Sequence, residues 1–128
     1  MRTNAGRDFQ ARVMGNGADG DAGANAMRPA DYIALSSDGT AESAGNTTLP
    51  GEIVAGTLAR VQAVYAHTNG QATYTLSKTF TSDDTITIRK IGVFNASSSG
   101  TLVFETLLDT EADLEPGDQV LITETVTL

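Results

Sequence analysis

Polar and hydrophobic residues alternate along most of the chain after residue 30. Two alternating segments flank Asn69-Gly70, a dipeptide that readily forms the type I′ turn of a β-hairpin. In the second segment Tyr74, Leu76 and Phe80 can face one side, while threonine and serine residues face the other. This pattern predicts strands in a sheet with one buried face and one solvent-exposed face.

The same alternation predicts further strands over residues 32–35, 85–94, 101–105 and 119–128. A change of phase around Arg89 and Lys90 predicts a β-bulge or a strand that switches sheets. Acidic residues dominate the segment 109–118, which we expect to form a loop ending in a tight turn.

Strands joined by hairpin-length turns are typical of all-β folds. We therefore predict an antiparallel β-sandwich or a small barrel over residues 31–128. The residues predicted to form its core are Tyr74, Leu76, Phe80, Ile91, Val93, Phe94, Phe104, Val120 and Ile122.

Residues 1–30 have a different pattern. Thr3 or Asn4 can cap a short helix that carries Phe9 and Val13 on one face. The residues that follow are mostly glycine, alanine, aspartate and asparagine, which are too small and polar to build a core. We expect the whole segment to be an extended N-terminal arm that is either disordered or ordered by a neighbouring molecule.

Length and charge narrow the choice of partners. With 128 residues the chain has room for one hydrophobic core, and its low aromatic content of 5% favours further stabilisation by assembly. The net charge of −8 argues against binding to nucleic acid, which needs a basic surface.

We also expect no contact with a membrane, because no apolar run approaches the roughly 20 residues of a transmembrane helix. The N-terminus lacks the apolar region of a secretory signal, so Sec export is not expected.

Candidate catalytic and metal-binding groups are few. His67 is the single histidine, no G-x-S-x-G motif occurs, and a local hydrogen bond is the simpler role for a histidine beside a turn. The acidic residues between 105 and 118 offer oxygen ligands for a divalent cation, or else keep a solvated edge from aggregating. The chain has no cysteine for a disulfide or thiolate site. We therefore predict neither a catalytic site nor a cofactor, and no metal ligands are assigned.

Several segments resemble a family of small virion proteins of tailed viruses, which are found in bacteriophages and in tailed viruses of archaea. They are TNAGRD at 3–8, YIAL at 32–35, TTLPGEI at 47–53, YAHTNG at 65–70, IGVFNASSSGTL at 91–102, and the turn at 116–118 with its final strand. The resemblance covers nearly the whole chain and consists of turns and strands. It implies a place in the virus particle, and it supplies no active site.

The resemblance leads us to expect a non-enzymatic structural subunit of a tailed virus particle. A capsid decoration or turret protein that binds the shell of major capsid protein is the first expectation, with homotrimers that are assembled into virions in the host cytoplasm. The alternatives are a tail or tail-fibre component, a β-sandwich that binds host glycans during adsorption, and an enzyme such as a depolymerase. The residues predicted to form the assembly interface of the arm are Phe9 and Val13 as apolar anchors, with Arg2, Arg7 and Arg12 facing an acidic neighbour.

Overall fold

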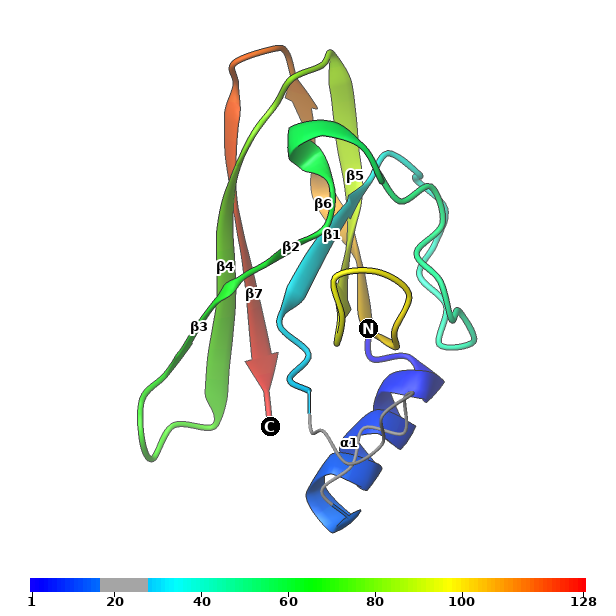
Figure 1. Ribbon diagram of the computed structural model, residues 1–128, viewed down its shortest axis with the longest axis vertical. Coiled ribbons are helices and arrows are strands. Elements are labelled where there is room, and N and C mark those ends of the chain that lie inside the picture. The colour runs from blue at the N-terminus through cyan, green and yellow to red at the C-terminus, as the bar shows by residue number, and fades with distance from the viewer. Residues whose placement is uncertain (17–27) are drawn as a thin grey trace.

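The computed structural model describes residues 1–16 and 28–128, which form two antiparallel sheets and one N-terminal helix (Figure 1). The first sheet has the order β2-β1-β5-β6, with β1 Tyr32–Ser36, β2 Val61–Gln62, β5 Ile86–Phe94 and β6 Leu102–Leu114. The second sheet has the order β3-β4-β7, with β3 Val64–His67, β4 Thr73–Thr81 and β7 Gln119–Thr127. Helix α1 spans Asn4–Asn16, and a short 3₁₀ helix spans Gly56–Leu58. The all-β sandwich is thus confirmed.

The predicted hairpin is confirmed. Strands β3 and β4 pair in antiparallel register, with Tyr65 opposite Leu76, and the turn between them contains Gly70 at a φ of 86°. Glycine occupies this positive φ without the steric cost that a Cβ would add. The predicted type I′ turn is wrong, because it needs a positive φ at both central residues and Asn69 does not have one. The N–H of Gln71 donates to Thr68 O over 3.0 Å, so Asn69 and Gly70 are the centre of a turn in which only the glycine is left-handed.

Short connections tie the two sheets together. Ala63 separates β2 from β3, and its N–H donates to the carbonyl of Asp31 over 2.7 Å. At the other end, the N–H of Ser82 donates to Asp118 O over 2.7 Å, and the N–H of Gly117 donates to Ser82 O over 2.8 Å. These bonds satisfy backbone groups that would otherwise be left unpaired where the chain leaves one sheet for the other.

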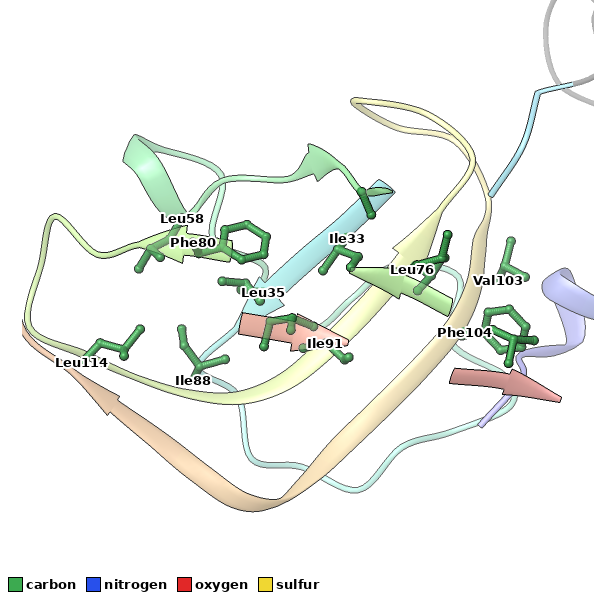
Figure 2. Packing of buried hydrophobic residues seen from close by; sticks show 14 of the residues in the cluster. Ile33, Leu35, Leu58, Leu76, Phe80, Ile88, Ile91, Val103, Phe104 and Leu114 are labelled. Carbon is green, nitrogen blue, oxygen red and sulfur yellow. The ribbon is translucent and has the colours of Figure 1, made fainter. Parts of the chain in front are cut away.

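The main core lies between the sheets (Figure 2). Six of the nine predicted core residues are buried in it, namely Leu76, Phe80, Ile91, Val93, Phe104 and Ile122, while Tyr74 and Val120 pack against it partly exposed. Phe94 is also buried, as predicted, but not between the sheets. It belongs to a second cluster, with Ala34, Leu49 and Leu102. Consecutive strand residues point to opposite faces, so Val93 and Phe94 cannot share one core.

The second cluster exists because the connection between β1 and β2 covers the outer face of the first sheet. Leu49, from this connection, is 4% exposed and lies over Gly92 of β5. A Cβ added at Gly92 would come within 3.1 Å of both Leu49 Cδ2 and Leu102 Cδ1. Glycine at this position therefore lets the connection pack directly on the strand.

Strand β6 continues through part of the acidic segment, so the prediction of a loop over 109–118 is wrong as far as Leu114. Thr87 and Ile88 of β5 pair with Asp113 and Ala112 of β6. The Thr87 hydroxyl donates to Asp113 Oδ1 over 2.6 Å, which gives one of the acidic side chains a cross-strand partner. The predicted bulge is confirmed, because the register shifts between Ile88 and Lys90.

The first sixteen residues pack on the sandwich. Residues 1–3 run antiparallel to β6, where the N–H of Thr3 donates to Val103 O over 3.0 Å and the N–H of Glu105 donates to Met1 O over 2.9 Å. The Thr3 hydroxyl oxygen accepts from the Gly6 N–H over 2.8 Å, so Thr3 caps the helix. Residues 1–3 thereby cover part of the β6 edge.

For residues 1–16, this packing corrects the expectation of an arm that is either disordered or ordered by a neighbouring molecule. Phe9 is 6% exposed and lies in the main core cluster, and Val13 packs against that cluster. The short helix itself was predicted correctly, with Thr3 rather than Asn4 as its cap. Residues 17–27 of the predicted arm lie outside the described residues.

We predict that Phe9→Ala lowers the free energy of unfolding by about 3 kcal/mol, because it removes a buried ring from the core. Arg7→Ala, on the exposed side of the same helix, is the matched control and should change it by less than about 0.5 kcal/mol. Equilibrium unfolding in urea measures both. Equal stability of the two variants would show that the helix does not contribute to the fold.

Candidate assembly surface

The outward-facing side chains of the second sheet carry no charge. They alternate with the core residues of β3, β4 and β7, and the strand register brings them together on one face. We call this surface the hydroxyl face. It consists of Val64, Ala66, Thr73, Thr75, Ser77, Thr79, Thr81, Gln119, Leu121, Thr123, Thr125 and Thr127.

The sequence favours this surface locally. Threonine is β-branched and packs well beside its cross-strand neighbours. Thr73 lies opposite Thr127 and Thr75 lies opposite Thr125, so methyl and hydroxyl groups form a regular pattern on two adjacent strands. The Cβ atoms of such a pair are about 5 Å apart, and the short side chains of similar size give the sheet a flat outer surface.

Two apolar side chains add to the hydroxyl face at its margins. Val64 of β3 is 65% exposed and Leu121 of β7 is 64% exposed. Hydroxyl groups can both donate and accept hydrogen bonds, so they can pair with many partner surfaces. Methyl groups and exposed apolar residues supply the surface whose burial favours association.

The edges of this sheet are also open. Within the described residues, β3 and β7 each pair only with β4. Their outer backbone groups can therefore accept a further strand from a partner. In Figure 1 the β3–β4 hairpin and β7 form one side of the molecule, opposite the connection between β1 and β2.

The five residues predicted as an assembly interface fall into two groups in the structure, one packed on the core and one exposed. Phe9 and Val13 face their own core, so they do not anchor the segment on a neighbour. Arg2, Arg7 and Arg12 lie exposed on and beside α1. Arg2 Nη1 donates to Gln10 Oε1 over 2.5 Å, and Arg7 donates to Asn4 Oδ1. The hydroxyl face was not predicted as an interface, although the threonine alternation carries its signal.

His67 and Glu111 have local partners. His67 Nδ1 lies 2.9 Å from Thr73 O, a contact across the hairpin. Glu111 forms an ion pair with Arg89 at 2.8 Å. Across residues 1–16 and 28–128, no group of three or more histidine, cysteine or acidic side chains is placed to hold a metal ion.

One acidic side chain of β7 lies in phase with the core residues Ile122 and Val126. Glu124 of β7 lies opposite Leu76, and its Oε1 accepts a hydrogen bond from the Thr106 hydroxyl of β6 over 3.3 Å. Burial raises the pKa of Glu124, and this hydrogen bond offsets only part of the shift. The contact joins β6 to β7, which belong to different sheets.

Comparison with models of known protein families and with curated proteins found no match for this chain. In the part of the chain that the structure describes, no helix is long and apolar enough to cross a membrane.

We predict that Glu124→Gln reduces the loss of stability as pH rises. The raised pKa means that the folded protein binds more protons than the unfolded chain between the ordinary glutamate pKa and the raised value. The wild type therefore loses stability as pH increases through that window, and the variant should lose less.

Urea unfolding at about pH 4 and about pH 7 tests this expectation, since the pH dependence of stability reports such shifts. Glu115→Gln changes an exposed carboxylate in the β6–β7 turn and is the matched control. The same pH dependence in Glu124→Gln and the wild type would contradict the assignment.

Proposed function

We propose that this protein is a non-enzymatic structural subunit of a tailed virus particle, most directly a capsid decoration or turret protein that binds the shell of major capsid protein. The hydroxyl face carries the proposal: an uncharged, open sheet surface on a chain with a net charge of −8. The resemblance of the turns and strands to small virion proteins supports the same conclusion.

Electrostatics explains why the hydroxyl face suits assembly. Acidic subunits repel one another, and like charges placed across an interface cost several kcal/mol. A face without carboxylates lets two copies, or a copy and a shell protein, approach without that cost. A standard interface buries about 800 Å² on each partner. We propose that the hydroxyl face contributes the centre of such an interface in a homotrimer.

The folded N-terminus changes how the subunit is expected to bind. Residues 1–16 are already packed on the sandwich, so they need no partner in order to become ordered. The subunit then docks as a preformed body and loses little conformational entropy on binding. Arg2, Arg7 and Arg12 remain positioned to contact an acidic neighbour beside α1.

We predict that Thr125→Lys prevents incorporation of the protein into particles. The substitution places a charge on the hydroxyl face, next to Thr75 of the central strand β4, where an interface would bury it unpaired. Ser43→Lys, on the exposed connection between β1 and β2, adds the same charge elsewhere and should be incorporated normally. Immunoblots of purified particles, formed in cells that express each variant, measure the incorporation.

Gold-labelled antibody on intact particles tests the location. Label on the head at regular positions is expected, and label confined to the tail would support the tail component instead. If purified particles contain none of this protein, the virion role is wrong.

A hollow of about 360 Å³ favours one alternative, a glycan-binding module. Tyr65 is 59% exposed at its rim, and its ring lies 5.6 Å from that of Tyr74. Aromatic faces and buried polar groups are the usual features of small-molecule sites. Asp31 lines the hollow, and its Oδ1 is buried without a hydrogen-bond partner. The residues lining the hollow are Pro29, Ala30, Asp31, Tyr65, Tyr74 and Leu76.

A glycan array separates this alternative from a purely structural role. If the hollow binds sugar, the wild type should give a defined ligand, and Tyr65→Ala should lose at least about tenfold in affinity because it removes the exposed ring. Val54→Ala, another exposed apolar position, is the control. An array without any ligand for the wild type would remove the alternative.

A further inference from the structure

One carboxylate contacts both an amine and a side-chain amide on the outer side of the first sheet. Glu105 Oε1 lies 3.0 Å from Lys90 Nζ. The other oxygen, Oε2, accepts a hydrogen bond from Asn46 Nδ2 over 2.7 Å. Lys90 belongs to β5, Glu105 to β6, and Asn46 to the connection between β1 and β2. Three separate parts of the chain therefore meet at Glu105.

The charged pair of the site is closed to solvent. The side chains of Lys90 and Glu105 are both 0% exposed, and Asn46 is half-buried. The connection that carries Asn46 also supplies Thr40 Oγ1 at 3.1 Å and Asp38 Oδ1 at 3.5 Å from Lys90 Nζ. Two of the three groups that contact Nζ are thus on the segment that carries the amide.

Besides the ion pair, this arrangement includes the side-chain amide of Asn46. A buried pair of opposite charges costs free energy to desolvate, and apolar residues of similar size are often at least as stabilising. The carboxylate here also orients an amide whose carbonyl carbon is an electrophile. A nucleophile and an electrophile with a leaving group thus contact the two oxygens of one buried carboxylate that can carry protons between them, which is the arrangement required for an acyl transfer within one chain.

We propose that Lys90 and Asn46 react to form an intramolecular amide cross-link, with Glu105 carrying the proton. The Lys90 ammonium gives one proton to Glu105 Oε1, which leaves a neutral amine and a neutral carboxyl group. Lys90 Nζ then attacks Asn46 Cγ, and a new Nζ–Cγ bond forms.

The second half of the reaction releases ammonia. Glu105 donates the proton that it received to Asn46 Nδ2, and the carboxylate that results takes the second proton from Lys90 Nζ. The Cγ–Nδ2 bond breaks, and the leaving nitrogen departs as ammonia. Glu105 ends protonated, so no unpaired charge stays buried. No oxidant, metal or cofactor enters the balance.

The product ties the covering connection to β5. It closes a covalent loop between residues 46 and 90, which restricts the unfolded chain as a disulfide does. The chain has no cysteine, so this amide would provide the covalent cross-link that a disulfide provides in other proteins. The inference concerns the stability of the fold and does not depend on the proposed virion role.

Intact-mass spectrometry of the full-length folded protein tests the proposal. The expected mass is that of the sequence minus one molecule of ammonia. Asn46→Ala and Glu105→Gln should each keep the full sequence mass, because the first lacks the leaving group and the second lacks the proton carrier. Circular dichroism confirms that each variant keeps its β structure, and wild-type protein alone already decides whether ammonia is lost.

Peptide mapping locates the missing ammonia. Trypsin cannot cleave after an acylated lysine, so a joined peptide containing both residues 46 and 90 is expected in place of two separate ones. Asn69→Ser is the matched control, because an Asn-Gly sequence can lose ammonia by forming a cyclic imide. It should leave the mass difference unchanged. A folded wild type at full sequence mass, a loss mapped to another asparagine, or a joined peptide in Glu105→Gln would each overturn the proposal.

Discussion

Lys90 and Glu105 lie on the side of the first sheet that faces away from the sandwich core, yet both side chains are fully buried. Charged groups taken out of water need partners and cover. The connection between β1 and β2 provides both, with Thr40 and Asp38 near the ammonium group and Asn46 on the carboxylate. The N-terminal amino group adds a bond to the backbone carbonyl of Glu105 over 2.7 Å. The covering connection is therefore tied to this pair, and the N-terminus is bonded to the backbone of one of its two residues.

The two sheets differ as a result. The first sheet is covered on its outer face by the connection and its apolar cluster, and part of its β6 edge is covered by residues 1–3. The second sheet keeps an outer face of hydroxyl and small apolar groups, with edge strands that pair only with β4 among the described residues. The surface available to a partner is consequently concentrated on the second sheet, and this asymmetry underlies the proposed role in assembly.

Prediction from sequence succeeded where the signal was local. The Asn69-Gly70 hairpin, the bulge before Lys90 and the cap at Thr3 each follow from the conformational preferences of a few adjacent residues. It failed where a distant segment decides the outcome. The acidic end of β6 forms a strand because β5 lies beside it, and Phe94 is buried in a second cluster rather than between the sheets because Leu49 returns to cover it.

The candidate site shows the same division. Alternation along β4 and β7 determined which side chains share a face, since the period of a strand is fixed by its backbone. Only the tertiary structure decided which faces stay exposed, because burial depends on what packs from elsewhere. It also brought Lys90, Glu105 and Asn46 together from three segments, and it turned Phe9 toward its own core. The hydrophobic effect is non-directional and favours burial against any apolar surface. A local pattern therefore cannot distinguish an apolar side chain that packs on its own sheet from one that packs on a neighbouring molecule.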